Sequence, residues 1–447
     1  MEFSYPFPLP PYPFKMPKSS NSRRRPIAID LFAGAGGFSL GIEQAGFDVV
    51  VAVEQDPVHA AVYAFNFPHA EVICADVGTL SAQAIREAAV RGWMYHNPKN
   101  RASWNGEIDL VFGGPPCQGF SLMGKRRLDD ERNDLVFHFY RLVKELQPRY
   151  FVMENVPGMN QGEHALYLQR LLAEFETAKY HITQPVRVLN AADFGVPQKR
   201  RRLFLLGSRD GEPPLEYPDP QMCPKPKSVT VRDAIADLPN LDNFPELKKT
   251  DEVLLTPLQL EQLEASASLY VKKLRGLVRD RYNLAYPRLW HPRLLTSSMQ
   301  TQHTTAAIGR FEEMQPGQLE MVSRLRRLDS DKCCHTLRAG TGSERGSYTS
   351  PRPIHPIYPR VISVREAARL HSFPDWFRFH TTKWHGFRQV GNAVPPLLGR
   401  VLGSQIVATL DIVPPLQTEP LELGDAQLIR LNFSKATQYW EILRITS

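Results

Sequence analysis

The sequence predicts an α/β fold whose first half is a mostly parallel β-sheet covered by helices on both faces. One observation behind this prediction is a series of short runs rich in Val, Ile and Phe that alternate with stretches of helix length. A second is the strand–helix–strand order, because parallel strands need a crossover connection between them. A third is that Gly-rich and Pro-rich loops follow several of these runs, and such loops at the carboxyl ends of strands bind ligands.

The predicted elements follow one another closely up to about residue 210. Strands are expected at residues 27–32, 49–54, 71–76, 109–114 and 150–156. Helices are expected between them at residues 37–45, 57–66, 81–91 and 134–147. Two further strands, with a loop between them, are expected at residues 181–190 and 202–209.

The pattern changes after residue 210, where prolines become frequent and the alternation stops. Thr256 to Gln259 form a capping-box pattern with Pro at the first helical position, which predicts that a helix starts there. Residues 288–359 are irregular, polar and basic. A helical pattern returns at residues 364–371, and a last compact segment spans residues 389–410.

Composition limits the classes of protein that this chain can represent. No run of about 18 apolar residues occurs, so no membrane span is expected. Five cysteines among 447 residues are too few for a disulfide framework and indicate a reducing compartment, which we expect to be the cytoplasm. Prolines interrupt the apolar start of the chain and positive charges follow it, which is unlike a signal peptide. The net charge of +7 is compatible with a polyanionic partner but does not require one.

A Gly-rich turn and two carboxylates mark the ends of the first three predicted strands. The turn contains Gly34 and Gly36, which let the backbone approach a ligand closely. Glu54 ends the second strand, where a carboxylate can hold ribose hydroxyls, and Asp76 ends the third, where it can accept from an adenine amino group. Each feature alone fits a plain turn or a solvated charge. Together they favour a nucleoside-containing cofactor, and the dinucleotide fingerprint of hydride-transfer enzymes is only approximated.

A cysteine, a glutamate and a basic run follow the later strands. Cys117 stands in a loop of Gly and Pro after the fourth strand, where a thiol is a better candidate for a nucleophile than for a core residue. Glu154 follows the fifth strand and can protonate a substrate atom that gains electron density during attack. The run from Gln198 to Arg202 is either a solvated basic segment or a source of guanidinium groups for a carbonyl oxygen or phosphates.

Two further patterns lie in the second half of the chain. Gly391 to Pro396 form a Gly, Asn and Pro loop, which can also be a simple turn before the last helix. The triplet Cys333, Cys334 and His335 fits no zinc spacing and lacks a fourth ligand, so no metal site is expected.

Taken in order, these motifs resemble the DNA (cytosine-5) methyltransferase family, most closely its bacterial restriction–modification members. The resemblance rests on Pro-Pro-Cys-Gln around Cys117, Glu-Asn-Val at Glu154, Gln-x-Arg-x-Arg from Gln198, and the Gly-Asn-Ala-Val-Pro loop. It implies a Rossmann-like methyltransferase domain that uses S-adenosylmethionine, together with a smaller, irregular target-recognition domain. Thr336 and Leu337 look like a Thr-Leu pair of that recognition region, and residues 360–377 resemble the structural motif that packs it onto the catalytic domain.

The resemblance also implies roles for individual residues. The S-adenosylmethionine pocket is expected to involve Phe32, Gly34, Gly36, Glu54, Asp76, Pro116, Leu135 and Asn392. The catalytic residues are expected to be Cys117 as the nucleophile, Glu154 at cytosine N3, Arg202 near cytosine O2, and Arg200 as the other arginine of that run. Contacts with the substrate DNA are expected from Ser121 and Gln118.

These roles describe methyl transfer to C5 of a flipped cytosine in double-stranded DNA through a covalent bond between Cys117 and C6. A cognate restriction endonuclease acting on the same site is the partner that such a system implies. A monomer is expected, because flipping one base of one strand needs no symmetry. Three alternatives remain open: a tRNA cytosine-5 methyltransferase, a non-catalytic DNA-binding protein on the same fold, and a nicotinamide-dependent oxidoreductase. The length of residues 211–355 and the lack of a Cys-Phe-Thr triplet count against the first of these.

The resemblance divides the chain into a Pro-rich, disordered tail, a catalytic and cofactor-binding domain, a target-recognition domain, a return to the catalytic domain, and an extension without an assigned role: residues 1–25, 26–210, 211–358, 359–412 and 413–447. Two departures from the family stand out. His371 replaces a residue that is usually Gln, and the insertion at residues 92–106 is longer than in compact members.

Overall fold

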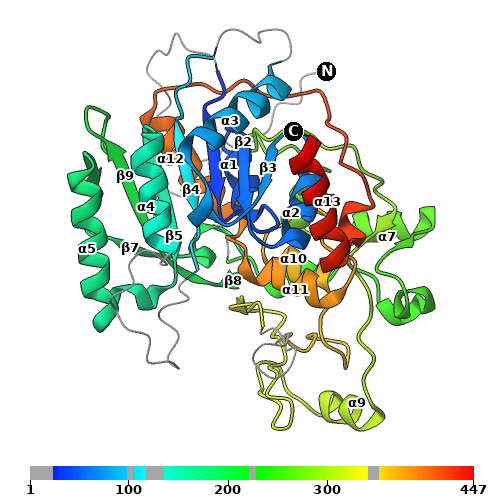
Figure 1. The fold of residues 1–447 in the computed structure, drawn as a ribbon. Helices are drawn as coiled ribbons and strands as arrows, with labels where there is room; N and C mark the ends of the chain where they lie inside the picture. The colour runs from blue at the N-terminus through cyan, green and yellow to red at the C-terminus, as the bar shows by residue number, and fades with distance from the viewer. Residues whose placement is uncertain (1–23, 98–103, 117–134, 221–227, 341–351, 447) are drawn as a thin grey trace, which may run out of the picture.

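The computed structural model describes residues 24–97, 104–116, 135–220, 228–340 and 352–446. Its centre is an eight-stranded sheet in the order β3-β2-β1-β4-β5-β9-β6, with β7 also paired to β9 (Figure 1). The five strands on one side are parallel: β1 (Ile27–Leu31), β2 (Asp48–Glu54), β3 (Glu71–Cys74), β4 (Leu110–Gly113) and β5 (Tyr150–Asn155). The other three are antiparallel to their neighbours: β6 (Tyr180–Ile182), β7 (Arg187–Asn190) and β9 (Arg201–Arg209).

Helices cover both faces of this sheet, which confirms the α/β prediction. One face packs against α3 (Ala82–His96), α4 (Leu135–Leu146) and α5 (Glu163–Thr177). The opposite face packs against α1 (Gly37–Gln44) and α12 (Pro396–Thr409). The central strands are buried on both faces, as expected for parallel strands between two helical layers. The helix α2 (Pro57–Asn66) begins at the predicted residue, because Asp56 caps it and Pro57 occupies its first position.

One predicted strand is wrong. Residues 181–190 form two short strands, β6 and β7, instead of one, and both pair with β9. Pro185 lies between them, and a proline has no N–H to donate to a neighbouring strand. The break lets β6 and β7 meet successive parts of β9.

The helical predictions need three corrections. The helix α3 runs on to His96 and so includes the first part of the insertion. Gly391 and Asn392, expected in a loop, are the last residues of α11 (Lys383–Asn392). The irregular region contains α9 (Thr305–Glu312), whose N-terminus is capped by the Thr304 side chain.

Residues 228–340 form short elements beside the sheet, to the lower right in Figure 1. They include the helices α6 (Val231–Ile235), α7 (Pro257–Ser266) and α8 (Leu269–Leu274), and the paired strands β10 (Val253–Leu254) and β11 (Leu294–Leu295). The predicted capping box at the start of α7 is present, with Thr256 and Gln259 bonded to each other's backbone. The strand β12 (Cys334–His335) pairs with β8 (Gln198–Lys199) and brings this region to the sheet edge. Buried apolar residues of α6 share one cluster with α10 (Val364–Leu370).

Both ends of the described chain pack on the body. Arg25, expected in the disordered tail, is instead buried, and its Nε lies 2.6 Å from Oδ1 of Asp48. The extension contains the last helix, α13 (Phe433–Thr446), so α12 is not the last helix. Trp440 of α13 donates a 3.0 Å hydrogen bond to the carbonyl of Pro57 at the start of α2. No helix of the described residues is long and apolar enough to cross a membrane.

Candidate active site

The carboxyl ends of the parallel strands carry the predicted cofactor residues. Phe32, Gly34 and Gly36 follow β1 and have φ values of 70°, 57° and 99°. A Cβ atom at Gly36 would lie 2.3 Å from the ring of Phe67, so both the positive φ and the lack of space require glycine there. Gly36 therefore lets the backbone of the turn pass close to the ring of Phe67.

Glu54 and Asp76 lie at this same edge, because β2 and β3 are paired and Glu54 is opposite Cys74. The Glu54 carboxylate accepts hydrogen bonds from the backbone N–H of Gly34 at 2.7 Å and of Asp56 at 2.8 Å. Burial raises the pKa of Glu54. A carboxylate with one hydrogen bond on each oxygen keeps lone pairs for further donors, such as the two hydroxyls of a ribose. These residues fit the ribose end of a nucleoside.

The turn after α11 lies against the Gly-rich turn, although the two are far apart in the sequence. A Cβ atom at Gly37 would lie 2.7 Å from Cβ of Ala393 and 2.8 Å from the carbonyl oxygen of Val394. Asn392, directly before Ala393, is exposed, and so is Pro116 after β4. Leu135 is half-buried at the start of α4. The structure thus brings the second Gly and Asn motif to the predicted cofactor edge.

Glu154 and Arg202 form an ion pair at the next part of the edge. Glu154 is on β5 and Arg202 on the antiparallel neighbour β9. The Nε of Arg202 lies 2.7 Å from Oε1 of Glu154, and their side chains are 15% and 12% exposed. The pair is therefore largely desolvated but still reachable from solvent.

The loop that leads to the predicted nucleophile passes beside this pair. A Cβ atom at Gly114 would lie 2.8 Å from Oε2 of Glu154, and Nδ2 of Asn155 donates to the carbonyl of Pro115 at 3.2 Å. These contacts place the Gly-Pro-Pro segment next to the carboxylate. The predicted residues Cys117, Gln118 and Ser121 lie outside the described residues.

Arg200 has a different environment from Arg202. Its side chain is buried and donates to the carbonyl oxygens of Leu337 at 3.0 Å and Gly391 at 2.9 Å. Burial, and to a lesser degree the charge of Arg202, lowers the pKa of Arg200 to about 9. The structure brings Arg202, and not Arg200, to Glu154.

Two residues without a predicted role join the same region. Gln198 and His371 are fully buried and bonded to each other, with Nε2 of Gln198 2.9 Å from Nδ1 of His371. The signal in the sequence was the replacement of the family's usual Gln by His371.

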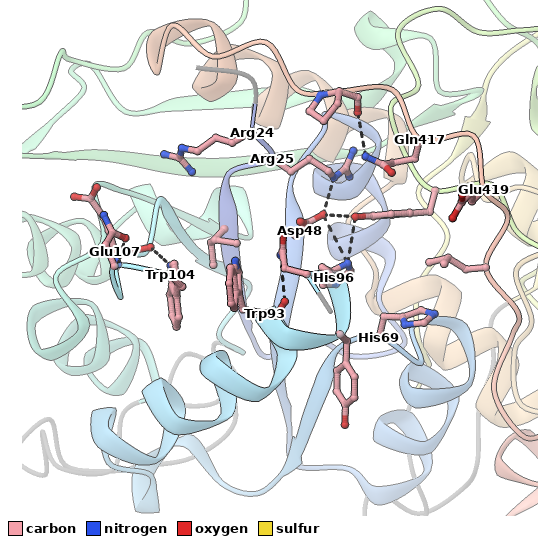
Figure 2. A pocket seen from close by; sticks show the side chains of 17 residues that line it. Arg24, Arg25, Asp48, His69, Trp93, His96, Trp104, Glu107, Gln417 and Glu419 are labelled. Carbon is pink, nitrogen blue, oxygen red and sulfur yellow. Dashed lines mark hydrogen bonds and ion pairs between the residues drawn. The ribbon is translucent and has the colours of Figure 1, made fainter. Parts of the chain in front are cut away.

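A cavity of about 890 Å³ lies at the opposite edge of the sheet, around the starts of β1 and β2 (Figure 2). Arg25, Asp48 and Tyr286 line it, and Asp48 accepts from both of the other side chains. In Figure 2, dashed lines join Asp48 to Arg25 and to His96. Ligands of open α/β sheets bind at the carboxyl ends of strands, so the candidate active site is the edge with Glu54 and Glu154.

Comparisons with known proteins agree with this geometry. The family model described as C-5 cytosine-specific DNA methylase matches residues 27–408. The chain is 50% identical to the type II methyltransferase M.XorII of Xanthomonas oryzae pv. oryzae, over 92% of each chain. It is 31% identical to the type II methyltransferase M.AgeI of Thalassovita gelatinovora, over 85% of this chain and 98% of that one.

A solved structure from E. coli, of a prophage-encoded candidate DNA modification methyltransferase, is also similar. It has a TM-score of 0.66 and 33% sequence identity, and the match covers 86% of this chain and 99% of that one. The sheet described above therefore has the Rossmann-like fold of methyltransferases. The Gly-rich turn bonded to Glu54 and the ion pair of Glu154 and Arg202 lie at one edge of that sheet, and the chain belongs to the C-5 cytosine-specific DNA methylase family.

Proposed function

We propose that this enzyme transfers the methyl group of S-adenosylmethionine to C5 of a flipped cytosine in a specific duplex DNA sequence, through a covalent bond from Cys117 to C6. The observation that carries the proposal is the 2.7 Å ion pair of Glu154 and Arg202, beside the loop that leads to Cys117. Methylation of DNA at cytosine C5 is the reaction of the family, and the restriction–modification setting is that of its named relatives.

The described residues suit the cofactor. Glu54 would hold the ribose hydroxyls, Asp76 the adenine amino group, and the backbone from Phe32 to Gly36 would line the chain that carries the sulfonium. Pro116, Leu135 and Asn392 would close the pocket from the opposite side. Bound there, S-adenosylmethionine would supply an electrophilic methyl group.

The amino acid side chains would make cytosine C5 nucleophilic. The thiolate of Cys117 adds to C6, which moves electron density toward C5 and N3. Glu154 protonates or hydrogen-bonds N3, and general acid help of this kind is typically worth about 10²–10⁴-fold. Arg202 lies where it can both orient Glu154 and donate to the cytosine O2. After methyl transfer, C5 loses its proton and the thiolate leaves, which restores the aromatic ring.

Arg200 would support this site through hydrogen bonds to the backbone. Its two hydrogen bonds hold the backbone of Leu337 and of Gly391, which belong to the recognition region and to the end of α11. We therefore propose a positioning role for Arg200 in place of direct contact with the base.

Residues 211–358 would read the DNA sequence, and residues 26–210 with 359–412 would form the catalytic domain. The base must leave the helix stack to reach Glu154, at a cost of a few kcal/mol that phosphate and base contacts offset. Ser121 and Gln118 would contribute to these contacts. Such a protein needs no second copy, and its partner would be an endonuclease that cuts the same unmethylated sequence.

The experiment is to trap the covalent intermediate. The purified protein is incubated with tritiated S-adenosylmethionine and mixed-sequence duplex DNA that contains 5-fluorocytosine, because fluorine at C5 blocks the final proton loss. We expect a labelled protein–DNA band that resists denaturant. The band should disappear in Cys117→Ala and persist in the control Cys333→Ala, whose thiol is half-buried in the recognition region.

Other outcomes separate the alternatives. A band on tRNA but not on varied DNA would replace the DNA proposal by the RNA reading. Cofactor binding without a band on either nucleic acid would favour the non-catalytic reading. Binding of NAD in place of S-adenosylmethionine would favour the oxidoreductase.

A further inference from the structure

A continuous set of hydrogen bonds, made by two buried side chains, runs from the recognition region to the turn after α11. At one end, Oε1 of Gln198 accepts from the backbone N–H of Leu337 at 3.0 Å. In the middle, Nε2 of Gln198 lies 2.9 Å from Nδ1 of His371. At the other end, Nε2 of His371 lies 2.9 Å from the carbonyl oxygen of Ala393. We call the side chains of Gln198 and His371 the Gln–His bridge.

The chemistry of the two ends fixes the direction of every hydrogen bond in the bridge. The N–H of Leu337 can only donate, so the amide oxygen of Gln198 faces it and the amide NH₂ faces His371. The carbonyl of Ala393 can only accept, so His371 carries its proton on Nε2 and accepts at Nδ1. A protonated imidazole would set two donors against each other at Nδ1. Burial, with the charge of Arg200, keeps the pKa of His371 well below its usual value.

The bridge ends where it can act on the cofactor edge. Ala393 follows Asn392 directly, and its side chain packs against Gly37 at the start of α1. The neighbouring Gly391 packs tightly against the recognition region, since a Cβ atom at Gly391 would lie 2.5 Å from the backbone nitrogen of Ala339. The same turn thus touches the Gly-rich turn on one side and the recognition region on the other.

We propose that His371 is a positioning residue that couples the recognition region at Leu337 to the turn at Asn392 and Ala393, which we call the cofactor turn. This inference rests on the proposed function, because it assumes that this turn lines the S-adenosylmethionine pocket. Movement of Leu337 when DNA binds is passed through Gln198 to His371 and changes the position of the Ala393 carbonyl. Because coupling between two sites is reciprocal, a bound cofactor also favours the arrangement of the recognition region that binds DNA.

Burial gives the bridge its effect. Gln198 and His371 are both 0% exposed, so no water replaces a lost partner at either of them. A fully satisfied buried network holds one arrangement of its backbone, and a partly satisfied one does not. A glutamine at position 371 offers the same donor and acceptor, so His371→Gln should keep the bridge. His371→Leu removes the hydrogen bond at the Ala393 carbonyl and leaves one N–H of the Gln198 amide without its partner, while Nε2 of Gln198 still donates to the carbonyl of Leu370 at 3.2 Å.

The test measures cofactor binding by calorimetry, with and without duplex DNA that carries the target sequence. For the wild type we expect DNA to tighten binding of S-adenosylhomocysteine, the demethylated cofactor, by a factor between about 5 and 150. We expect His371→Leu to weaken binding in the absence of DNA about tenfold and to reduce the DNA effect to less than about twofold. His371→Gln should restore both quantities to within about threefold of the wild type.

The matched control is His355→Leu. His355 is also buried, and its Nδ1 accepts from the backbone N–H groups of Ile357 and Tyr358. Among the described residues, it does not contact the cofactor turn. If His371→Leu acts only by loosening the fold, His355→Leu at equal loss of stability will change cofactor binding as much, and the inference is overturned. A double variant that adds Gln198→Leu should weaken cofactor binding little more than His371→Leu alone, because both changes remove the same bridge. Fully additive losses of cofactor affinity would also overturn the inference.

Failure of the inference can be told apart from failure of the proposed function. If the wild type binds no S-adenosylhomocysteine at all, the proposed function is wrong. If the wild type binds it and His371→Leu binds it equally well with the same DNA effect, the proposed function stands and the positioning role of His371 does not.

Discussion

Nε of Arg202 lies 2.7 Å from Oε1 of Glu154, and this contact joins two adjacent antiparallel strands at the carboxyl edge of the sheet. The arginine holds one carboxylate oxygen and leaves the other facing the Gly114 segment. An acid that must meet one ring nitrogen needs a fixed orientation, and the planar guanidinium of Arg202 can provide it through its contact with one carboxylate oxygen. Arg202 therefore orients Glu154, in addition to the contact with cytosine O2 that we propose for it.

This relationship predicts a non-additive loss of activity. Glu154→Gln should lower kcat by about 10²–10⁴-fold. Arg202→Lys keeps the charge but loses the planar donor, and we expect kcat to fall by about 10–100-fold, or about 1.4–2.7 kcal/mol in barrier height. Because both residues act on one carboxyl group, the double variant should lose less than the product of the two factors. Single-turnover methylation rates check this, and simple multiplication of the losses would contradict it.

The sequence predicted the edge of this site well because its signals are local. The β/α alternation locates strand ends, and parallel strands bring their carboxyl ends together. It was therefore possible to predict, without knowledge of the rest of the fold, that Glu54, Asp76 and Glu154 lie at one edge.

Arg200 shows where local reasoning fails. Residues two apart share a face only within one continuous strand. The extended strand is interrupted at Arg200, between β8 and β9, where the N–H of Arg200 bonds to the carbonyl of Gln198 at 3.0 Å. Arg200 and Arg202 therefore point to different partners. The role of α13 was also out of reach, because its contacts on α2 are with residues more than half the chain away.

The Gly-rich turn predicts a difference between two glycine substitutions. Gly36→Ala places a methyl group 2.3 Å from the Phe67 ring at a φ of 99°, so it should destabilise the protein by more than about 2 kcal/mol and weaken cofactor binding at least tenfold. Gly34→Ala has a φ of 57° and nothing within 4 Å, so it should cost only about 1–2 kcal/mol. Urea unfolding and cofactor calorimetry compare the two. Equal losses would show that crowding at Phe67 has no part in the effect.

A buried ion-pair network predicts how firmly the recognition region is held. The guanidinium of Arg369 lies 2.6 Å from Asp237 of that region and 2.7 Å from Asp375, and all three side chains are 5% exposed or less. Asp237→Leu leaves part of a buried charge unpaired and should cost about 3–5 kcal/mol in unfolding free energy. The exposed pair of Arg232 and Asp331 is the control, and Arg232→Ala should cost less than about 1 kcal/mol. Chemical denaturation measures both, and similar costs would contradict the argument.

Buried histidines predict a loss of stability in mild acid. Burial lowers the pKa of His355 to about 4, against 6.5 in the unfolded chain. Above pH 6.5 both states are neutral there, so no pH dependence arises; below it the unfolded state binds a proton that the folded state does not, and the free energy of unfolding falls. Between pH 7 and pH 5 the loss from this group is about 2 kcal/mol. His355→Gln should remove that part of the pH dependence in thermal or urea unfolding, and an unchanged slope would argue against a neutral His355.

The C-terminal extension predicts that helix α13 supports the cofactor edge through α2. Trp440 is 7% exposed and donates to Pro57, which opens α2 directly after Asp56. Asp56 in turn donates its backbone N–H to Glu54, so a series of contacts links the Trp440 indole, the start of α2 and the Glu54 carboxylate. Trp440→Ala removes a buried indole and should cost about 3–5 kcal/mol, whereas Phe433→Ala, at a residue 61% exposed on the same helix, should stay within about 0.5 kcal/mol. Trp440→Ala should also weaken cofactor binding several-fold at temperatures where the protein remains folded, because the Asp56 N–H then holds Glu54 less firmly. If stability falls but cofactor affinity measured by calorimetry does not, α13 stabilises the fold without reaching the site.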